Sequence, residues 1–159
     1  MPPVIIQQAK EYSEDLHHNI PLDWTVHNTS SGYMDRDGWL KAVTQFSKIC
    51  GASPVNNQII FFDGHDSHFD DRALTHMKSK NIQPFILKVG DSINDQPNDN
   101  GPNSTLKALY NRSKAKWMVK DGTTRFQPHH MNAVLVEAWD AFKVAYGNNY
   151  VTICYLEGF

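Results

Sequence analysis

The chain has 159 residues, of which 40% are hydrophobic and 20% charged, and its formal net charge at pH 7 is −2. This length suits one domain, and the composition is globular rather than disordered. The charge argues against a uniformly basic nucleic-acid-binding coat, and no apolar run reaches the roughly 18 residues that a membrane span needs. The start, Met1 to Ile6, lacks the features of a signal peptide, and two cysteines, Cys50 and Cys154, are too few for a disulfide framework. We therefore expect a single domain over residues 1–159 in an intracellular protein with reduced thiols.

The first third of the chain predicts two strands and one helix. Pro3 to Gln8 is apolar and β-branched, which favours a strand, whereas the polar stretch Glu11 to Asn19 favours a loop. Trp24 to His27 alternates as a strand does. Asp35 or Asp37 can cap the following helix, and Gly51 stands at its usual C-terminal position. The apolar face of this helix is formed by Trp39, Ala42, Val43, Phe46, Ile49 and Cys50.

The middle of the chain predicts a strand, a helix and a second strand. Gln58 to Asp63 is a continuous apolar run that ends in an acid, which is typical of a strand covered on both faces inside a parallel or mixed sheet. Phe69 to Lys80 follows as a helix with acids at its positive end. Ile82 to Val89 is a second apolar strand, and Gly90 to Asn103 has the composition of a loop.

Two helices are predicted in the last third. The first runs from about Ser104 to Val119, capped by Asn103 or Ser104, and the second has Pro128 in its first turn and the strongest amphipathic pattern in the chain. The tail from Tyr150 to Phe159 is ambiguous. The resulting order of strand, helix, strand, helix and helix is that of an α/β protein, in which sites form at the carboxyl ends of strands.

Two polar segments follow the two apolar strands of the middle region. In Phe61 to His68, Asp63 comes directly after the strand, Gly64 permits a sharp turn, and histidines add hydrogen-bond donors. By itself this segment favours an ordinary Asp-Gly turn. In Asn94 to Pro102, Asp99 stands just ahead of a helix, and by itself this is typical of a polar loop with a helix cap.

Together the two acids are more specific than either one. Asp63 and Asp99 are 36 positions apart, with one intervening strand, and both stand at the expected site-bearing edge of the sheet. Two-metal phosphoryl transfer needs carboxylates from separate elements to converge in this way. Carboxylate oxygens are also the ligand type that Mg²⁺ prefers.

These segments resemble the motifs of a known family. Phe61 to His68 resembles the second-aspartate motif of DDE superfamily endonucleases of the pogo and jerky type, a hydrophobic strand followed by Asp-Gly-His-x-Ser-His. Gln96-Pro97-Asn98-Asp99 resembles their Gln-Pro-x-Asp motif, and Leu106-Lys107 follows it in a helix, as in the family. Gly32-Tyr33-Met34 stands where the family often has Gly-Trp-Met. The resemblance covers nearly the whole chain.

The resemblance implies a ribonuclease H-like fold and strand cleavage and transfer at transposon DNA ends, dependent on two Mg²⁺ or Mn²⁺ ions. It implies that Asp63 and Asp99 are catalytic metal ligands and that His65, His68 and Gln96 support them. It also implies a nuclear location.

Two departures from the family pattern matter. Lys88 to Ile93 replaces the usual Pro-Pro-His-Thr stretch, and nothing resembles the context of the family's first aspartate. The expectation is therefore a partial domain that lacks the first two strands of the fold and is inactive as this chain. The missing strands would expose a central strand edge and favour self-association, unless Val4 to Gln8 pairs directly with Ile59 to Phe62.

Basic residues gather between Ser104 and Arg125, and Lys107, Arg112, Lys114 and Lys116 are the candidate DNA-binding residues. The same pattern is typical of a solvated helix face. Two further functions stay open, a non-catalytic DNA- or protein-binding remnant and a His/Asp metal hydrolase. The hydrolase would need further ligands at set spacings, and neither His17-His18 nor His129-His130 supplies them.

Overall fold

In the computed structural model the strands form two separate parallel sheets. The structure describes residues 2–9, 14–87, 101–122, 126, 128–146 and 155–156. In the first sheet, β1 (Val4–Gln8) lies between β2 (Thr25–Thr29) and β5 (Tyr155–Leu156), with Val4 opposite both Thr25 and Tyr155. The second sheet pairs β3 (Gln58–Asp63) with β4 (Ile82–Leu87).

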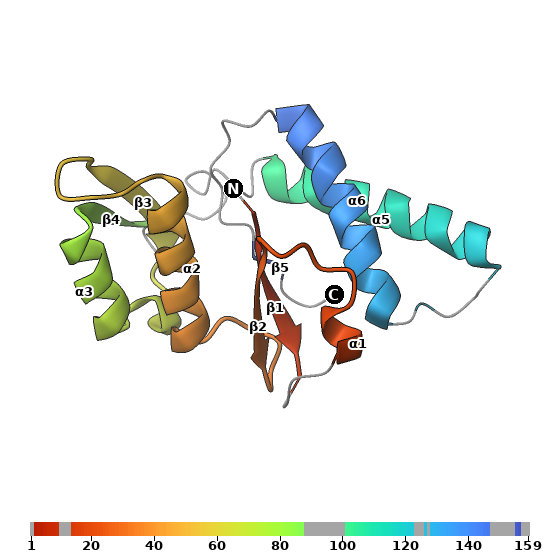
Figure 1. The fold of residues 1–159 in the computed structure, drawn as a ribbon, viewed down its shortest axis with the longest axis horizontal. Helices are drawn as coiled ribbons and strands as arrows, with labels where there is room; N and C mark the ends of the chain where they lie inside the picture. The colour runs from red at the N-terminus through yellow and green to blue at the C-terminus, as the bar shows by residue number, and fades with distance from the viewer. Residues whose placement is uncertain are drawn as a thin grey trace.

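The helices lie on both sides of the first sheet. Figure 1 shows α2 (Arg36–Ile49) between the two sheets, with α3 (Asp71–Ser79) beyond it, while α5 (Pro102–Asp121) and α6 (Pro128–Tyr146) cross each other on the other side of β1. The short α1 (Glu14–His17) lies against α6. A single 3₁₀ turn, η1 (Asp66–His68), follows β3. The predicted mixed α/β class is confirmed.

The two sides of β1 belong to two hydrophobic clusters. Successive side chains of a strand point to opposite faces, so Val4 and Ile6 join one cluster and Ile5 the other. The first cluster joins β1 to α2, α3, β3 and β4, and the second joins β1 to α5 and α6. Helix α2 is thus the element that carries packing from one sheet to the other.

Helix α2 forms where its periodicity predicts. Asp35 is the N-cap, and its side chain accepts a hydrogen bond from Gly38 N at 2.8 Å, which satisfies one of the free N–H groups of the first turn. Gly51, with φ of +63°, follows the helix in the left-handed conformation that glycine adopts readily. Trp39 and Val43 are fully buried, whereas Ile49, at the edge of the predicted face, is 44% exposed.

Two local predictions are wrong. The stretch Glu11 to Asn19, predicted as a loop, contains helix α1. This helix has four residues and packs against α6. Helix α5 is capped by Gly101 with no side-chain cap, rather than by Asn103 or Ser104. Proline is favoured at the first helical position because it has no N–H to satisfy, so Pro102 begins the helix earlier than the polar residues indicate.

The predicted burial of both faces of β3 is also wrong. Ile60 and Phe62 are buried against α2 and α3, but Ile59 is 54% and Phe61 57% exposed. In the register of the sheet Phe61 lies opposite Phe85, which is 54% exposed, with the two rings 5.1 Å apart. We call Ile59, Phe61 and Phe85 the exposed sheet face. It is uncovered because α5 and α6 pack on β1 instead.

The strand pairing also bears on the expected open edge. β1 does not pair with β3, and in the described part of the chain β4 is the sole neighbour of β3. The second edge of β1 is occupied by the two residues of β5. Among the residues with described positions, no helix is both long and apolar enough to cross a bilayer.

Candidate functional site

Asp63 is the last residue of β3 and lies opposite Leu87, the last residue of β4. Its side chain is about half exposed, at 48%. Asp63 therefore stands at the carboxyl edge of the parallel pair, where the sequence places it, and the chain leaves β4 beside it. Gln96 and Asp99 lie outside the described residues, so their position relative to Asp63 stays a prediction.

One carboxylate oxygen of Asp63 is held by two donors. Its Oδ1 lies 2.8 Å from Nδ1 of His68 and accepts a hydrogen bond from the backbone N–H of His65 at 3.2 Å. Both contacts come from the turn that Gly64 begins. They fix the orientation of the carboxylate, and in the described part of the chain no hydrogen bond or ion pair reaches Oδ2. That oxygen is available to a ligand.

His68 is itself fixed by the core. The residue is 5% exposed, and the centroid of its ring lies 4.3 Å from that of Trp39 and 5.5 Å from that of Phe62. Its Nδ1 also lies 3.1 Å from the backbone oxygen of Asp63. Both neighbours of Nδ1 are acceptors, so we assign the ring hydrogen to Nδ1. A buried histidine that packs against aromatic rings and holds a carboxylate is a positioning residue of the kind found around metal ligands.

His65 has a different place from His68. It is exposed, and its Nδ1 accepts hydrogen bonds from Ser67 N at 3.3 Å and from Ser67 Oγ at 2.8 Å. The side chain of His65 thus caps η1, and the backbone N–H of His65 donates a hydrogen bond to Asp63. Of the two predicted supporting histidines, one orients the Asp63 carboxylate through its ring and the other shapes the turn.

A charged cluster joins the starts of α2 and α3 close to this turn. Asp70 caps α3, and Arg72 donates to Asp70 at 2.8 Å and to Asp37 of α2 at 2.7 Å. The hydrogen bond from Arg72 is the main reason that the pKa of Asp70 falls to about 2, and the pKa of Arg72 is correspondingly raised. The link between Arg72 and Asp37 spans 35 residues and has no signal in the sequence.

A second polar group, also absent from the sequence analysis, lies along α2. The buried His27 bridges Asp35 and Lys41: its Nε2 lies 2.7 Å from Asp35 Oδ1, and its Nδ1 lies 2.9 Å from Lys41 Nζ. Because an ammonium can only donate, Nδ1 accepts and Nε2 carries the hydrogen. Burial raises the pKa of Asp35, but hydrogen bonds from Gly38 and His27 outweigh it, and the net pKa is lowered.

The four candidate DNA-binding residues do not form one stripe. Lys107 and Lys114 are seven residues apart and share a face of α5, whereas Arg112 and Lys116, four residues apart, share another. Lys114 lies over the ring of Phe126 at 5.0 Å, and Lys116 lies 3.4 Å from Glu137. Lys107 and Arg112 are exposed.

Comparison with known proteins decides the family. The sequence profile of the family described as DDE superfamily endonuclease matches residues 1–151. This chain belongs to that family. The resemblance that rested on the Asp-Gly-His-x-Ser-His and Gln-Pro-x-Asp motifs is thus confirmed at the level of the family.

A curated relative of this DDE superfamily endonuclease chain is the MFS-type transporter clz9 of Cochliobolus lunatus. The two are 27% identical over 143 residues, which is 89% of this chain and 14% of the relative. The chain therefore spans a small part of that protein. No solved structure matches, so the fold stands as mixed α/β with parallel strand pairs.

The described part of this DDE superfamily endonuclease chain does not contain a complete metal centre. Among those residues, no group of three or more His, Cys, Asp or Glu side chains lies close enough to hold an ion. Asp63 offers a hard oxygen ligand in a fixed orientation, which fits Mg²⁺ in type but not in number. Any divalent site built on Asp63 must draw further carboxylates from elsewhere.

Proposed function

We propose that this chain is a partial DDE endonuclease domain, derived from a transposase, that binds DNA and holds divalent cations through Asp63 and Asp99. The observation that carries the proposal is the fixed Asp63 carboxylate, whose Oδ1 is held by His68 and His65 and whose side chain is about half exposed. Mg²⁺ or Mn²⁺ bound there would activate an attacking oxygen and stabilise a leaving one in strand cleavage and transfer.

The chain path supports a shared site. β4 ends at Leu87 beside Asp63, and α5 begins at Pro102, so the segment that carries Gln96 and Asp99 departs from the edge where Asp63 stands. We further propose that this chain alone does not cleave DNA. Nothing in it resembles the first aspartate of the family, and two carboxylates are fewer than the family's three.

Divalent-cation titration tests the metal site. We expect Asp63→Asn and Asp99→Asn each to weaken Mg²⁺ or Mn²⁺ binding, measured by calorimetry, about tenfold or more, since loss of even an outer-shell partner costs about 10–100-fold. Asparagine keeps the shape of the side chain and removes its charge. The control is Asp71→Asn, which removes an exposed acid from the start of α3. Equal affinities in the parent chain and both site variants would contradict the proposal.

The alternative is a domesticated remnant that binds DNA or protein without catalysis. It is favoured by the absence, within the described ranges, of a complete ligand cluster. Duplex binding that is independent of Mg²⁺ and is weakened uniformly across sequences by Lys107→Ala or Arg112→Ala would support the remnant. Both residues are exposed, whereas Lys114 and Lys116 already have partners. The DNA partner and the nuclear location both stand as proposals.

We also propose that the chain associates with a second copy of itself through β3. In the described part of the chain this strand has one open edge, and it carries no lysine or proline that would block further pairing. The adjoining exposed sheet face adds apolar area. Sedimentation should show concentration-dependent association that Phe61→Lys reduces. Val144→Lys, at an 87% exposed position on α6, is the control and should leave association unchanged. A parent chain that stays monomeric at all concentrations would exclude this interface.

A further inference from the structure

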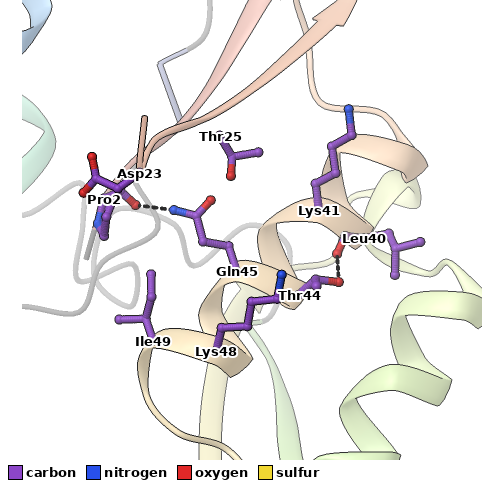
Figure 2. Close-up of a pocket in the computed structure, with 9 residues that line it drawn as sticks. All are labelled: Pro2, Asp23, Thr25, Leu40, Lys41, Thr44, Gln45, Lys48 and Ile49. Atoms are coloured by element: carbon purple, nitrogen blue, oxygen red, sulfur yellow. Dashed lines mark hydrogen bonds between the residues drawn. The ribbon is translucent and has the colours of Figure 1, made fainter. Parts of the chain in front are cut away.

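A pocket of about 560 Å³ lies along α2, on the side that faces β2. Its volume is within the range of small-molecule sites, roughly 300–1,000 Å³. Figure 2 shows that it is lined by one face of α2 together with Pro2, Asp23 and Thr25. It is separate from the candidate metal site. Its lining includes neither Trp39 nor His68 nor any other residue that holds Asp63.

The α2 side of the pocket is positively charged. Lys41 and Lys48 are seven residues apart on one face of α2 and both line the pocket. One N–H of the Lys41 ammonium is used by His27 at 2.9 Å, which leaves two for a ligand. Lys48 has no ion-pair partner in the part of the chain that the structure describes. Two cations on one wall favour an anionic group such as a phosphate.

The pocket also has two acceptors in its lining, Gln45 on α2 between the two lysines and Asp23. Gln45 is 9% exposed, and its Nε2 donates to the backbone oxygen of Pro2 at 2.8 Å. Its Oε1 is buried and has no hydrogen-bond partner among the residues that the structure describes, which is an unfavourable state for a buried acceptor. Asp23, across the pocket from Lys41 in Figure 2, is a second acceptor. A ligand that presents N–H or O–H groups to these two acceptors would satisfy both.

We propose that this pocket binds a nucleoside phosphate, with the phosphate at Lys41 and Lys48 and the donor groups of the sugar or base at Gln45 and Asp23. Leu40 and Ile49 supply apolar surface for the body of the ligand. A free nucleotide and the phosphorylated end of a DNA strand share this chemistry. The inference does not rest on the metal site, because none of the lining residues touches Asp63.

Calorimetric titration with deoxyadenosine monophosphate tests the proposal. We expect Lys41→Gln and Lys48→Gln each to weaken its binding about tenfold, the usual effect of losing a hydrogen bond to a charged group. Both lysines are exposed, so the variants should fold, and an unchanged melting temperature verifies this. Lys78→Gln is the matched control at an exposed lysine of α3, and Asp63→Asn separates this site from the metal site. Neither control should change the affinity.

The source of the phosphate is distinguished by further titrants. A short single-stranded oligonucleotide that binds only with a 5′-phosphate, and competes with the mononucleotide, would identify a strand end as the ligand. Competition by the mononucleotide alone would identify a free nucleotide. The proposal is overturned if inorganic phosphate binds as tightly as the mononucleotide, if the mononucleotide does not bind, or if Lys78→Gln weakens mononucleotide binding as much as Lys48→Gln does.

Discussion

Replacing Trp39 by alanine is expected to lower the free energy of unfolding by about 3–5 kcal/mol, the usual cost of removing a large buried aromatic side chain. Trp39 is fully buried and belongs to the cluster that joins β1, α2 and β3. Its ring packs edge-on against Phe62, with centroids 5.0 Å apart, and at a tilt against His68, with centroids 4.3 Å apart. Chemical denaturation monitored by circular dichroism would measure the loss.

The same substitution should also release His68. With no ring beneath it, His68 would no longer hold Oδ1 of Asp63 in one orientation, so divalent-cation affinity should fall even in the molecules that remain folded. Trp39→Phe is the control, because it keeps an aromatic surface for His68. It should retain most of the free energy of unfolding and most of the divalent-cation affinity. A stable Trp39→Ala protein with unchanged cation affinity would show that the contact between Trp39 and His68 has no part in positioning Asp63.

Gly38→Ala is expected to destabilise the protein by about 1–3 kcal/mol, the cost of overpacking a filled site. An alanine inside a helix usually stabilises relative to glycine by roughly 0.5–1 kcal/mol, so the expected sign is reversed. The reason is steric. A Cβ at Gly38 would lie 2.7 Å from Cδ2 of His27 and 2.8 Å from Sδ of Met34. Met34 has a flexible side chain that can move, whereas His27 is held at both ring nitrogens.

A double-mutant cycle would isolate this contact. His27→Ala removes the ring that the new methyl group meets, so Gly38→Ala should cost less, or stabilise, in the His27→Ala background. The coupling between the two changes is the measured quantity, obtained from thermal or urea unfolding of the four proteins. Additive effects would mean that the clash is relieved elsewhere, and a stabilising single Gly38→Ala would contradict the close approach itself.

Local patterns predicted most of the helices in this chain. Helix α2 could be placed because the cap at Asp35, the apolar spacing and the stop at Gly51 agree. The Asp-Gly-His segment likewise placed Asp63 at a strand end, and its family was correctly identified. These features depend on residues within a few positions of each other, which a sequence displays directly.

The features that could not be predicted from the sequence are those that depend on which helices and strands pack together. An apolar run such as Gln58 to Asp63 shows that a strand can be buried but not how many of its faces find a partner, and α5 and α6 cover β1 rather than β3. The packing of His68 against Trp39 and the bridge from Arg72 to Asp37 join elements about 30 residues apart. His27 carried a weaker signal, as a histidine at an inward position of a strand.

The double role of His68 affects how the family motif should be interpreted in other chains. This residue both orients Asp63 and fills a place between Trp39 and Phe62. Selection for a properly folded protein would therefore retain the histidine even after every requirement for DNA cleavage had lapsed. An intact Asp-Gly-His-x-Ser-His segment encoded in a genome would then indicate that the encoded protein still folds. It would not indicate whether that protein can still carry out transposition.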